Sequence, residues 1–150
     1  MKPFYLLLGA ESALAERALT KLTAELKSEN AQITTIFASE TQIGDISDAV
    51  APSLFADRRA LVIKDLQDLP EDSKEEVTRY LEDPDPTMTV IFIHKGGVKG
   101  KALLDAIKKA KPEIIACDSI KDALKQLDLM LQMQHLKEIC QSHLLHCEVR

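Results

Sequence analysis

Apolar residues in this chain follow two alternating patterns, short unbroken runs and longer stretches with helical spacing. Apolar or β-branched runs predict five strands, at residues 4–8, 32–37, 59–63, 88–93 and 114–117. Runs of this kind are typical of strands that are buried on both faces, as in a parallel sheet. Joined by helices, they predict an α/β fold, a five-stranded parallel sheet flanked by helices on both faces.

Amphipathic helices are predicted between these strands. Apolar residues recur three and four positions apart over residues 14–26, with Glu and Lys on the other side. A short helix is expected over residues 43–50, another opens at Pro70, and a third contains Leu103. Each of the last three is followed by a proline, at Pro52, Pro84 and Pro112. Proline ends a helix because it disfavours helical geometry in the residue before it.

The C-terminal stretch, residues 119–150, has no strand pattern and is predicted to be helical. Its apolar stripe is loose and consists of Leu124, Leu127, Leu131, Leu136, Ile139 and Cys140. Leu144, Leu145 and Val149 have little to pack against, which favours a fragment of something longer or an altered end. We therefore expect one domain at residues 1–118, followed at 119–150 by a helical extension or the start of a truncated second domain.

Composition narrows the class of protein. The chain has 150 residues, of which 45% are hydrophobic and 29% are charged, as expected of a globular domain. The first apolar run is too short for a secretion signal or a membrane span, so a cytoplasmic protein is predicted. The three cysteines, Cys117, Cys140 and Cys147, are then expected to be reduced thiols.

Charge argues against a dedicated nucleic-acid binder, because a net charge of −5 opposes the neutralisation of phosphates. The lysines are nevertheless clustered, at Lys95, Lys99, Lys101, Lys108, Lys109 and Lys111. Asp105 is the main opposing charge in this stretch of the sequence. A solvated helix face or a contact with a neighbouring subunit is favoured over a nucleic-acid site for this Lys95–Lys111 patch.

Two loops invite comparison with a phosphate-binding loop, which needs a second glycine followed by Lys and Ser or Thr. In residues 9–15, Leu14 and Ala15 stand where Gly and Lys are needed, and Glu11 brings the wrong charge. Residues 96–102 are one residue short of the motif, and Ala102 replaces the hydroxyl that holds magnesium. No nucleotide cofactor is therefore expected.

Metal and catalytic sites are not predicted either. Cys140, His143, His146 and Cys147 include zinc-ligand types, but their spacing does not match an ordinary zinc module. Ser12, Ser53 and Ser119 lie outside a nucleophile elbow. Asp83 and Asp85 indicate a turn.

One segment conflicts with the soluble pattern around it. Leu54 and Phe55 lie in a connection that begins with the turn residues Pro52 and Ser53 and ends with the charged segment Asp57–Arg59. Two large apolar side chains in such a place are either folded back into the core or held out for a partner. The sequence pattern leaves both possibilities open.

The segment Ser53–Ile63 resembles the signature segment of the delta subunit of the bacterial DNA polymerase III clamp loader. The order of the surrounding motifs agrees: Gly9–Glu11 after the first strand, Tyr80–Pro84 before a hydrophobic strand, and Gly100–Leu103 at a helix start. The resemblance covers roughly residues 4–118. Residues 127–150 do not resemble the family's continuation.

The resemblance implies a degenerate AAA+/P-loop NTPase-like domain that keeps the fold but does not bind ATP, and that has no catalytic residues of its own within the polymerase holoenzyme. It also implies that Leu54 and Phe55 insert into a hydrophobic pocket of the ring-shaped sliding clamp, the beta subunit, and help to open the ring for loading onto primed DNA. The residues that would shape or flank this plug are Ser53, Ala56, Arg58 and Arg59.

Other partners implied for the full-length protein are the gamma/tau ATPase and delta prime subunits, with DNA contacted only indirectly or weakly. An NTPase or a signalling domain is the alternative that the α/β pattern leaves open.

Overall fold

The computed structural model describes residues 1–118 and 120–147, and the side chains of residues 120–127 and 142–147 lie outside the description. The chain divides into two compact units, Met1–Cys117 and Asp118–Arg150, which are described separately.

The first unit is built on a sheet of five parallel strands. They are β1 (Phe4–Leu8), β2 (Gln32–Phe37), β3 (Arg59–Lys64), β4 (Met88–His94) and β5 (Glu113–Ala116). Their order across the sheet is β2-β3-β4-β1-β5, so β1 lies between β4 and β5. The predicted fold class is confirmed. The fifth strand was expected at 114–117 and lies one residue earlier.

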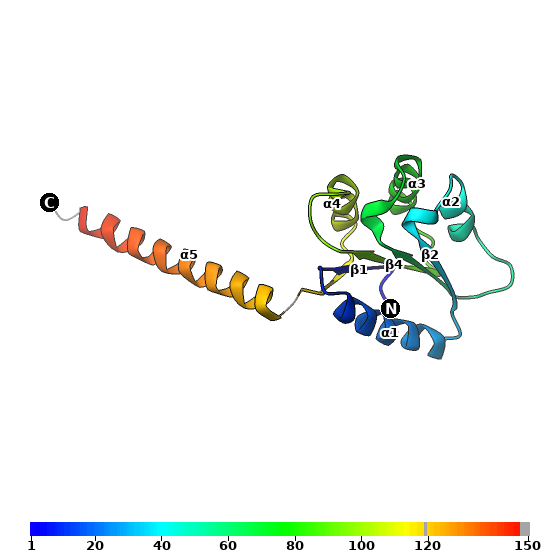
Figure 1. Cartoon of the computed structure of the whole chain (residues 1–150), viewed down its shortest axis with the longest axis horizontal. Helices are drawn as coiled ribbons and strands as arrows, with labels where there is room; N and C mark the ends of the chain where they lie inside the picture. Colours follow the sequence, from blue (N-terminus) through cyan, green and yellow to red (C-terminus); the bar gives the residue numbers. More distant parts are fainter. Residues whose placement is uncertain (119, 148–150) are drawn as a thin grey trace. The chain divides into compact units, whose positions relative to one another are not determined.

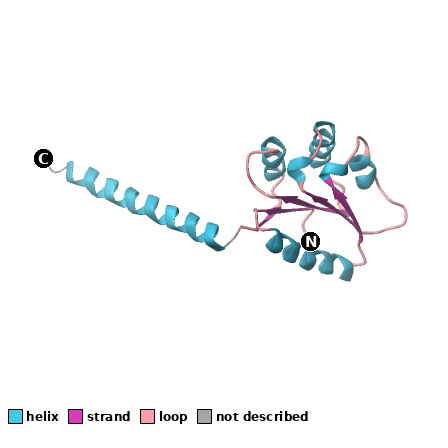
Figure 2. Cartoon of the chain, viewed as in Figure 1, coloured by secondary structure: helices cyan, strands magenta, loops and turns pink. Residues whose placement is uncertain are grey.

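Helices cover both faces of this sheet (Figures 1 and 2). They are α1 (Ser12–Ser28), α2 (Asp45–Val50), α3 (Glu71–Glu82) and α4 (Lys101–Lys109), with 3-10 turns at Ala38–Glu40 and Leu66–Asp68. Helices α2, α3 and α4 lie on one face and α1 lies on the other.

Alternate residues of each central strand supply the two halves of the core. In β1, Phe4 and Leu6 pack with apolar residues of α2, α3 and α4, whereas Tyr5 and Leu7 pack with those of α1. Strands β1, β3 and β4 are almost fully buried, which explains their unbroken apolar runs. Strand β2, at one edge, has only exposed and half-buried residues.

The second unit contains one long helix, α5 (Ile120–Cys147). Its exposed large apolar side chains in the described range are Leu129, Met130, Leu131, Met133, Leu136 and Ile139. Among the described residues, no helix combines the length and the apolar character that crossing a membrane requires.

Candidate functional site

The connection between α2 and β3 holds two large apolar side chains in solvent. Leu54 and Phe55 are each 97% exposed, whereas the neighbouring strand residues Ala60 and Leu61 are at most 1% exposed. The connection forms a long loop at the amino end of β3 (Figure 1). Of the two possibilities left by the sequence, the structure has the pair held outward.

The apolar loop, residues 52–58, is shaped locally by one internal hydrogen bond and one ion pair. The backbone N–H of Phe55 donates to Ser53 Oγ over 3.2 Å, a turn that serine favours. The Arg58 guanidinium pairs with Glu29 near the end of α1, and both side chains are partly exposed. Ala56 is half-buried.

Arg59 differs from Arg58 in being buried at the base of the loop. Only 8% of it is exposed. Its Nη1 donates to the carbonyl oxygen of Ala51, and its Nη2 lies 3.3 Å from Asp85 Oδ2. The sequence grouped Arg59 with the flanking residues of the plug, but the structure gives it contacts inside the domain.

A groove of about 450 Å³ adjoins the apolar loop. Gln32 and Thr34 of β2, Ala49 of α2, Pro52 and Met88 contribute to its walls, together with Leu54 and Phe55 themselves. The loop, the end of α2 and the edge strand therefore form one continuous surface around the exposed pair.

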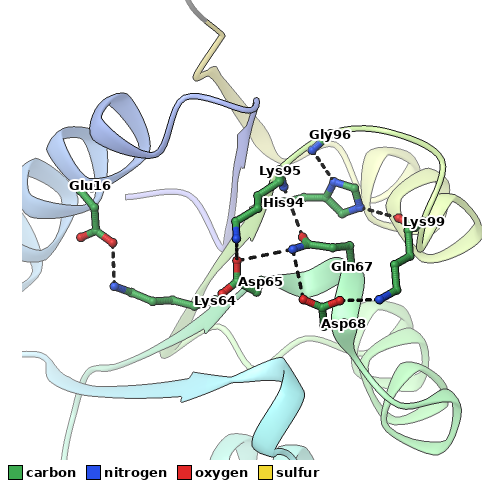
Figure 3. Close-up of polar contacts among 9 residues, drawn as sticks. All are labelled: Glu16, Lys64, Asp65, Gln67, Asp68, His94, Lys95, Gly96 and Lys99. Atoms are coloured by element: carbon green, nitrogen blue, oxygen red, sulfur yellow. Dashed lines mark hydrogen bonds and ion pairs between the residues drawn. The ribbon is translucent and has the colours of Figure 1, made fainter.

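The carboxyl ends of the strands, where open α/β sheets bind ligands, are occupied by ion pairs. Lys64 Nζ lies 2.8 Å from Glu16 Oε1, and Lys95 Nζ lies 3.0 Å from Asp65 Oδ1 (Figure 3). Lys99 pairs with Asp68. Asp105 was expected to be the main charge opposing the Lys95–Lys111 patch, which is wrong for Lys95 and Lys99, since they pair with Asp65 and Asp68. The residues after β3 approach the loop after β4 in the folded chain.

These pairs shift the pKa values of the groups involved. The hydrogen bond to Lys99 is the main cause that holds the pKa of Asp68 below its ordinary value, and the charges of Lys99 and Lys95 act in the same direction. The hydrogen bond to Asp65 raises the pKa of Lys95. Both effects favour the charged forms.

The loops at this end also use their backbone amides internally. Gly9 N donates to His94 O over 3.1 Å, and Glu11 N donates to Cys117 O over 2.9 Å. A pocket of about 210 Å³ remains between Ser12, Glu16, Lys64 and Lys95. Its charged walls are already paired within the chain.

Sequence reasoning missed His94, which organises the loop after β4. It is fully buried, Nδ1 accepts the Gly96 N–H over 2.9 Å, and Nε2 lies 2.9 Å from the Lys99 carbonyl oxygen (Figure 3). Because Nδ1 accepts, Nε2 carries the hydrogen that is donated to Lys99. A polar residue at the end of a buried apolar run was the signal available in the sequence.

The zinc-type residues give no site in the part of the chain that the structure describes. No group of three metal-binding side chains occurs among those described, and Cys140 is exposed. The side chains of His143, His146 and Cys147 lie outside the described residues. Cys117 is buried next to β5.

Comparisons with known proteins indicate a family and a fold. The sequence profile of the family described as DNA polymerase III, delta subunit, matches residues 5–118. The structure is similar to the Bacillus subtilis DNA clamp loader delta protein (YqeN), with a TM-score of 0.63 and 16% identity, over 80% of this chain and 39% of that one. It is also similar to Thermotoga maritima RuvB T158V, with a TM-score of 0.52 and 17% identity, over 78% of this chain and 37% of that one. No curated protein matches the sequence significantly.

These structural similarities show the fold, an α/β domain like those of AAA+ proteins. The chain spans less than two fifths of the length of either of the two solved proteins.

Proposed function

The chain belongs to the DNA polymerase III delta subunit family, and on this basis we propose that Leu54 and Phe55 bind a hydrophobic pocket of the cytoplasmic sliding clamp and help to open its ring for loading onto primed DNA. The observation that carries the proposal is the 97% exposure of both side chains. Contiguous exposed apolar surface rimmed by polar residues is typical of interaction sites, and protein–protein contacts are one such class.

The free energies of burial and of association define how much Leu54 and Phe55 contribute to binding. Burying a Leu or Phe side chain yields about 1.5–3 kcal/mol each. Association costs about 4–15 kcal/mol in lost freedom of the two proteins. The pair therefore acts as the central anchor, and the surface around it must supply further contacts. The groove beside the loop, with the edge strand β2 on one side, is the neighbouring surface suited to this.

Opening the ring requires no chemistry from this chain. The closed and open forms of the clamp are in equilibrium, and a ligand that binds the open form better shifts the equilibrium toward it. In the proposal, the energy of ATP enters through the gamma/tau ATPase, which joins the full-length protein together with delta prime. The ion pairs at the carboxyl ends of the strands support a domain that does not itself bind ATP.

The test is binding of the chain to an immobilised bacterial beta clamp. Leu54→Ala and Phe55→Ala are each expected to weaken binding by about 2 kcal/mol or more, roughly thirty-fold in Kd. Val98→Ala is the matched control, because Val98 is also an exposed apolar residue, 84% exposed, in the loop after β4.

Two results contradict the proposal. One is equal binding by the wild type and by the variant that carries both Leu54→Ala and Phe55→Ala. The other is an equal loss of binding in Val98→Ala, which would indicate that general surface hydrophobicity, and not this loop, drives the association.

A further inference from the structure

The base of the apolar loop is closed by a single buried side chain. Ala51 precedes residues 52–58 and Arg59 follows them, and Arg59 Nη1 donates to the carbonyl oxygen of Ala51. One hydrogen bond thus joins the two ends of the loop that carries Leu54 and Phe55. It comes from a side chain of which only 9% is exposed, in contrast to the partly exposed side chain of Arg58.

The other side of the same guanidinium is held by the turn before β4. Arg59 Nη2 lies 3.3 Å from Asp85 Oδ2. The remaining carboxylate oxygen of Asp85 accepts from Thr87 Oγ1 over 2.7 Å and from Thr87 N over 2.8 Å. These two hydrogen bonds are the main cause that lowers the pKa of Asp85, and the charge of Arg59 adds to them. Arg59 is therefore fixed against an ionised and oriented carboxylate.

Without this contact, the two ends of the loop are attached to different elements. On the β3 side, Arg58 O accepts from Gln32 N over 3.0 Å, and Arg59 N donates to Thr87 O over 3.1 Å. On the α2 side, Ala51 N donates only to Asp48 O, within its own helix turn. The hydrogen bond from the Arg59 side chain to the Ala51 carbonyl joins the α2 side of the loop directly to its β3 side.

Stability alone does not account for a buried arginine here. Its Nε is buried and has no hydrogen-bond partner among the described residues. Burying an incompletely satisfied charge is costly, and a well-packed apolar residue often replaces a buried ion pair without loss of stability. What the guanidinium does supply is a planar donor that reaches two fixed acceptors at once.

We propose that Arg59 is a positioning residue, which keeps the loop closed at its base so that Leu54 and Phe55 are presented outward in one arrangement. This inference rests on the proposed function. A loop that is already ordered loses less conformational freedom when it binds, and binding is correspondingly tighter. In the absence of the guanidinium, the pair is free to sample other positions, including the adjoining groove.

The first test needs no partner. Chymotrypsin cuts after Leu and Phe, and it requires a segment that unfolds locally. In the full chain, Arg59→Met is expected to increase the rate of cleavage after Leu54 and Phe55 by at least tenfold, measured by mass spectrometry. Arg17→Met, the control at an exposed arginine on α1, is expected to change it less than twofold. Asp85→Asn, which removes the carboxylate charge and one of its two acceptor oxygens but leaves Arg59 in place, should give an intermediate rate.

The second test uses the beta clamp. Arg59→Met is expected to raise the Kd about tenfold, and Arg59→Lys to restore part of the affinity. The inference is overturned if cleavage in Arg59→Met stays at the wild-type rate, or if cleavage after the buried Phe92 rises equally, since this would indicate global unfolding. It is also overturned if the loop is released while clamp affinity is unchanged. A wild-type chain that binds no clamp refutes the proposed function, and the cleavage rates still decide whether Arg59 holds the loop.

Discussion

The two ends of the sheet treat their loops in opposite ways. At the carboxyl ends of the strands, charged side chains pair with one another and backbone amides donate to neighbouring carbonyls. At the amino end of β3, two large apolar side chains lie in solvent with nothing in the described chain covering them. The charged side chains of the first end are paired within the domain, whereas the apolar pair of the second end is left exposed.

This difference shows that the exposed apolar pair does not lie where proteins of this fold class usually bind ligands. In open α/β sheets, ligands bind at the carboxyl ends of the strands. This chain keeps the sheet and fills those positions with its own ion pairs, while a connection at the opposite end carries the exposed residues. Function therefore has to be argued from the site, because the fold by itself does not point to the loop that carries Leu54 and Phe55.

The largest expected effect is the difference in unfolding free energy between replacing a buried and replacing an exposed phenylalanine. Phe92 is fully buried in the core beside Phe4, whereas Phe55 is 97% exposed. Phe92→Ala should lower the free energy of unfolding by about 3–5 kcal/mol, because it removes packed surface and leaves a cavity. Phe55→Ala should change it by less than about 0.5 kcal/mol. Urea denaturation of both variants measures the two values.

A loss above about 1.5 kcal/mol in Phe55→Ala would mean that the side chain is buried in solution, on the scale expected for apolar burial. The contrast between the two ends of the sheet would then fail at its amino end.

The second prediction tests whether His94 holds the loop after β4 in place. His94→Leu removes the acceptor of Gly96 N–H and the donor to the Lys99 carbonyl at nearly constant volume. Leaving these groups unpaired should cost about 1–3 kcal/mol of unfolding free energy. His135→Leu is the control, since His135 is exposed on α5. Faster hydrogen exchange at the Gly96 amide should accompany the loss, and unchanged exchange there would contradict the assigned role of His94.

Much of this architecture could be predicted from the sequence. The buried apolar run Phe4–Leu8 gave β1 with correct bounds, because a strand covered on both faces leaves an uninterrupted apolar signal. The edge strand β2 was found with correct bounds from its short β-branched segment. The short 3-10 turns at Ala38–Glu40 and Leu66–Asp68 were missed, because a turn of three residues is too short to show a periodic pattern in the sequence.

The candidate site could be predicted from the sequence only in part. The apolar pair conflicts with its polar neighbours, and that conflict is visible in the sequence. Whether the pair points outward depends on Arg59, whose partners Ala51 and Asp85 are brought together only by the fold. Adjacent arginines look alike in sequence, so their different burial could not be read from it. The clamp contact itself stays a prediction.

A smaller effect concerns Glu76, which ties α3 to the start of α2. Partial burial raises the pKa of Glu76, but hydrogen bonds from Gly44 N, Ser47 N and Ser47 Oγ outweigh it and hold the pKa below its ordinary value. A lowered folded-state pKa stabilises the fold above the unfolded pKa of about 4.3, and this stabilisation is lost as the pH falls through the folded value. Glu76→Gln should therefore cost about 1 kcal/mol at pH 7 and progressively less below about pH 4.

Urea denaturation at both pH values measures this change, with Glu75→Gln as the neighbouring exposed control. A cost in Glu76→Gln that does not change with pH would show that the carboxylate charge has no part in holding α2.

The smallest expected effect is the response to ATP and magnesium. Phosphates are bound by free backbone amides, an ammonium and a hydroxyl. Here Gly9 N and Glu11 N already donate to carbonyls, and Lys95 is paired with Asp65. Calorimetric titration should show no binding with a Kd below ~1 mM. A variant carrying Asp65→Asn and Asp68→Asn, which releases Lys95 and Lys99, should still not bind, because the amides stay occupied. Micromolar binding by the wild type would restore the carboxyl end as a ligand site, and binding by the variant alone would show that the ion pairs, and not the amides, exclude the nucleotide.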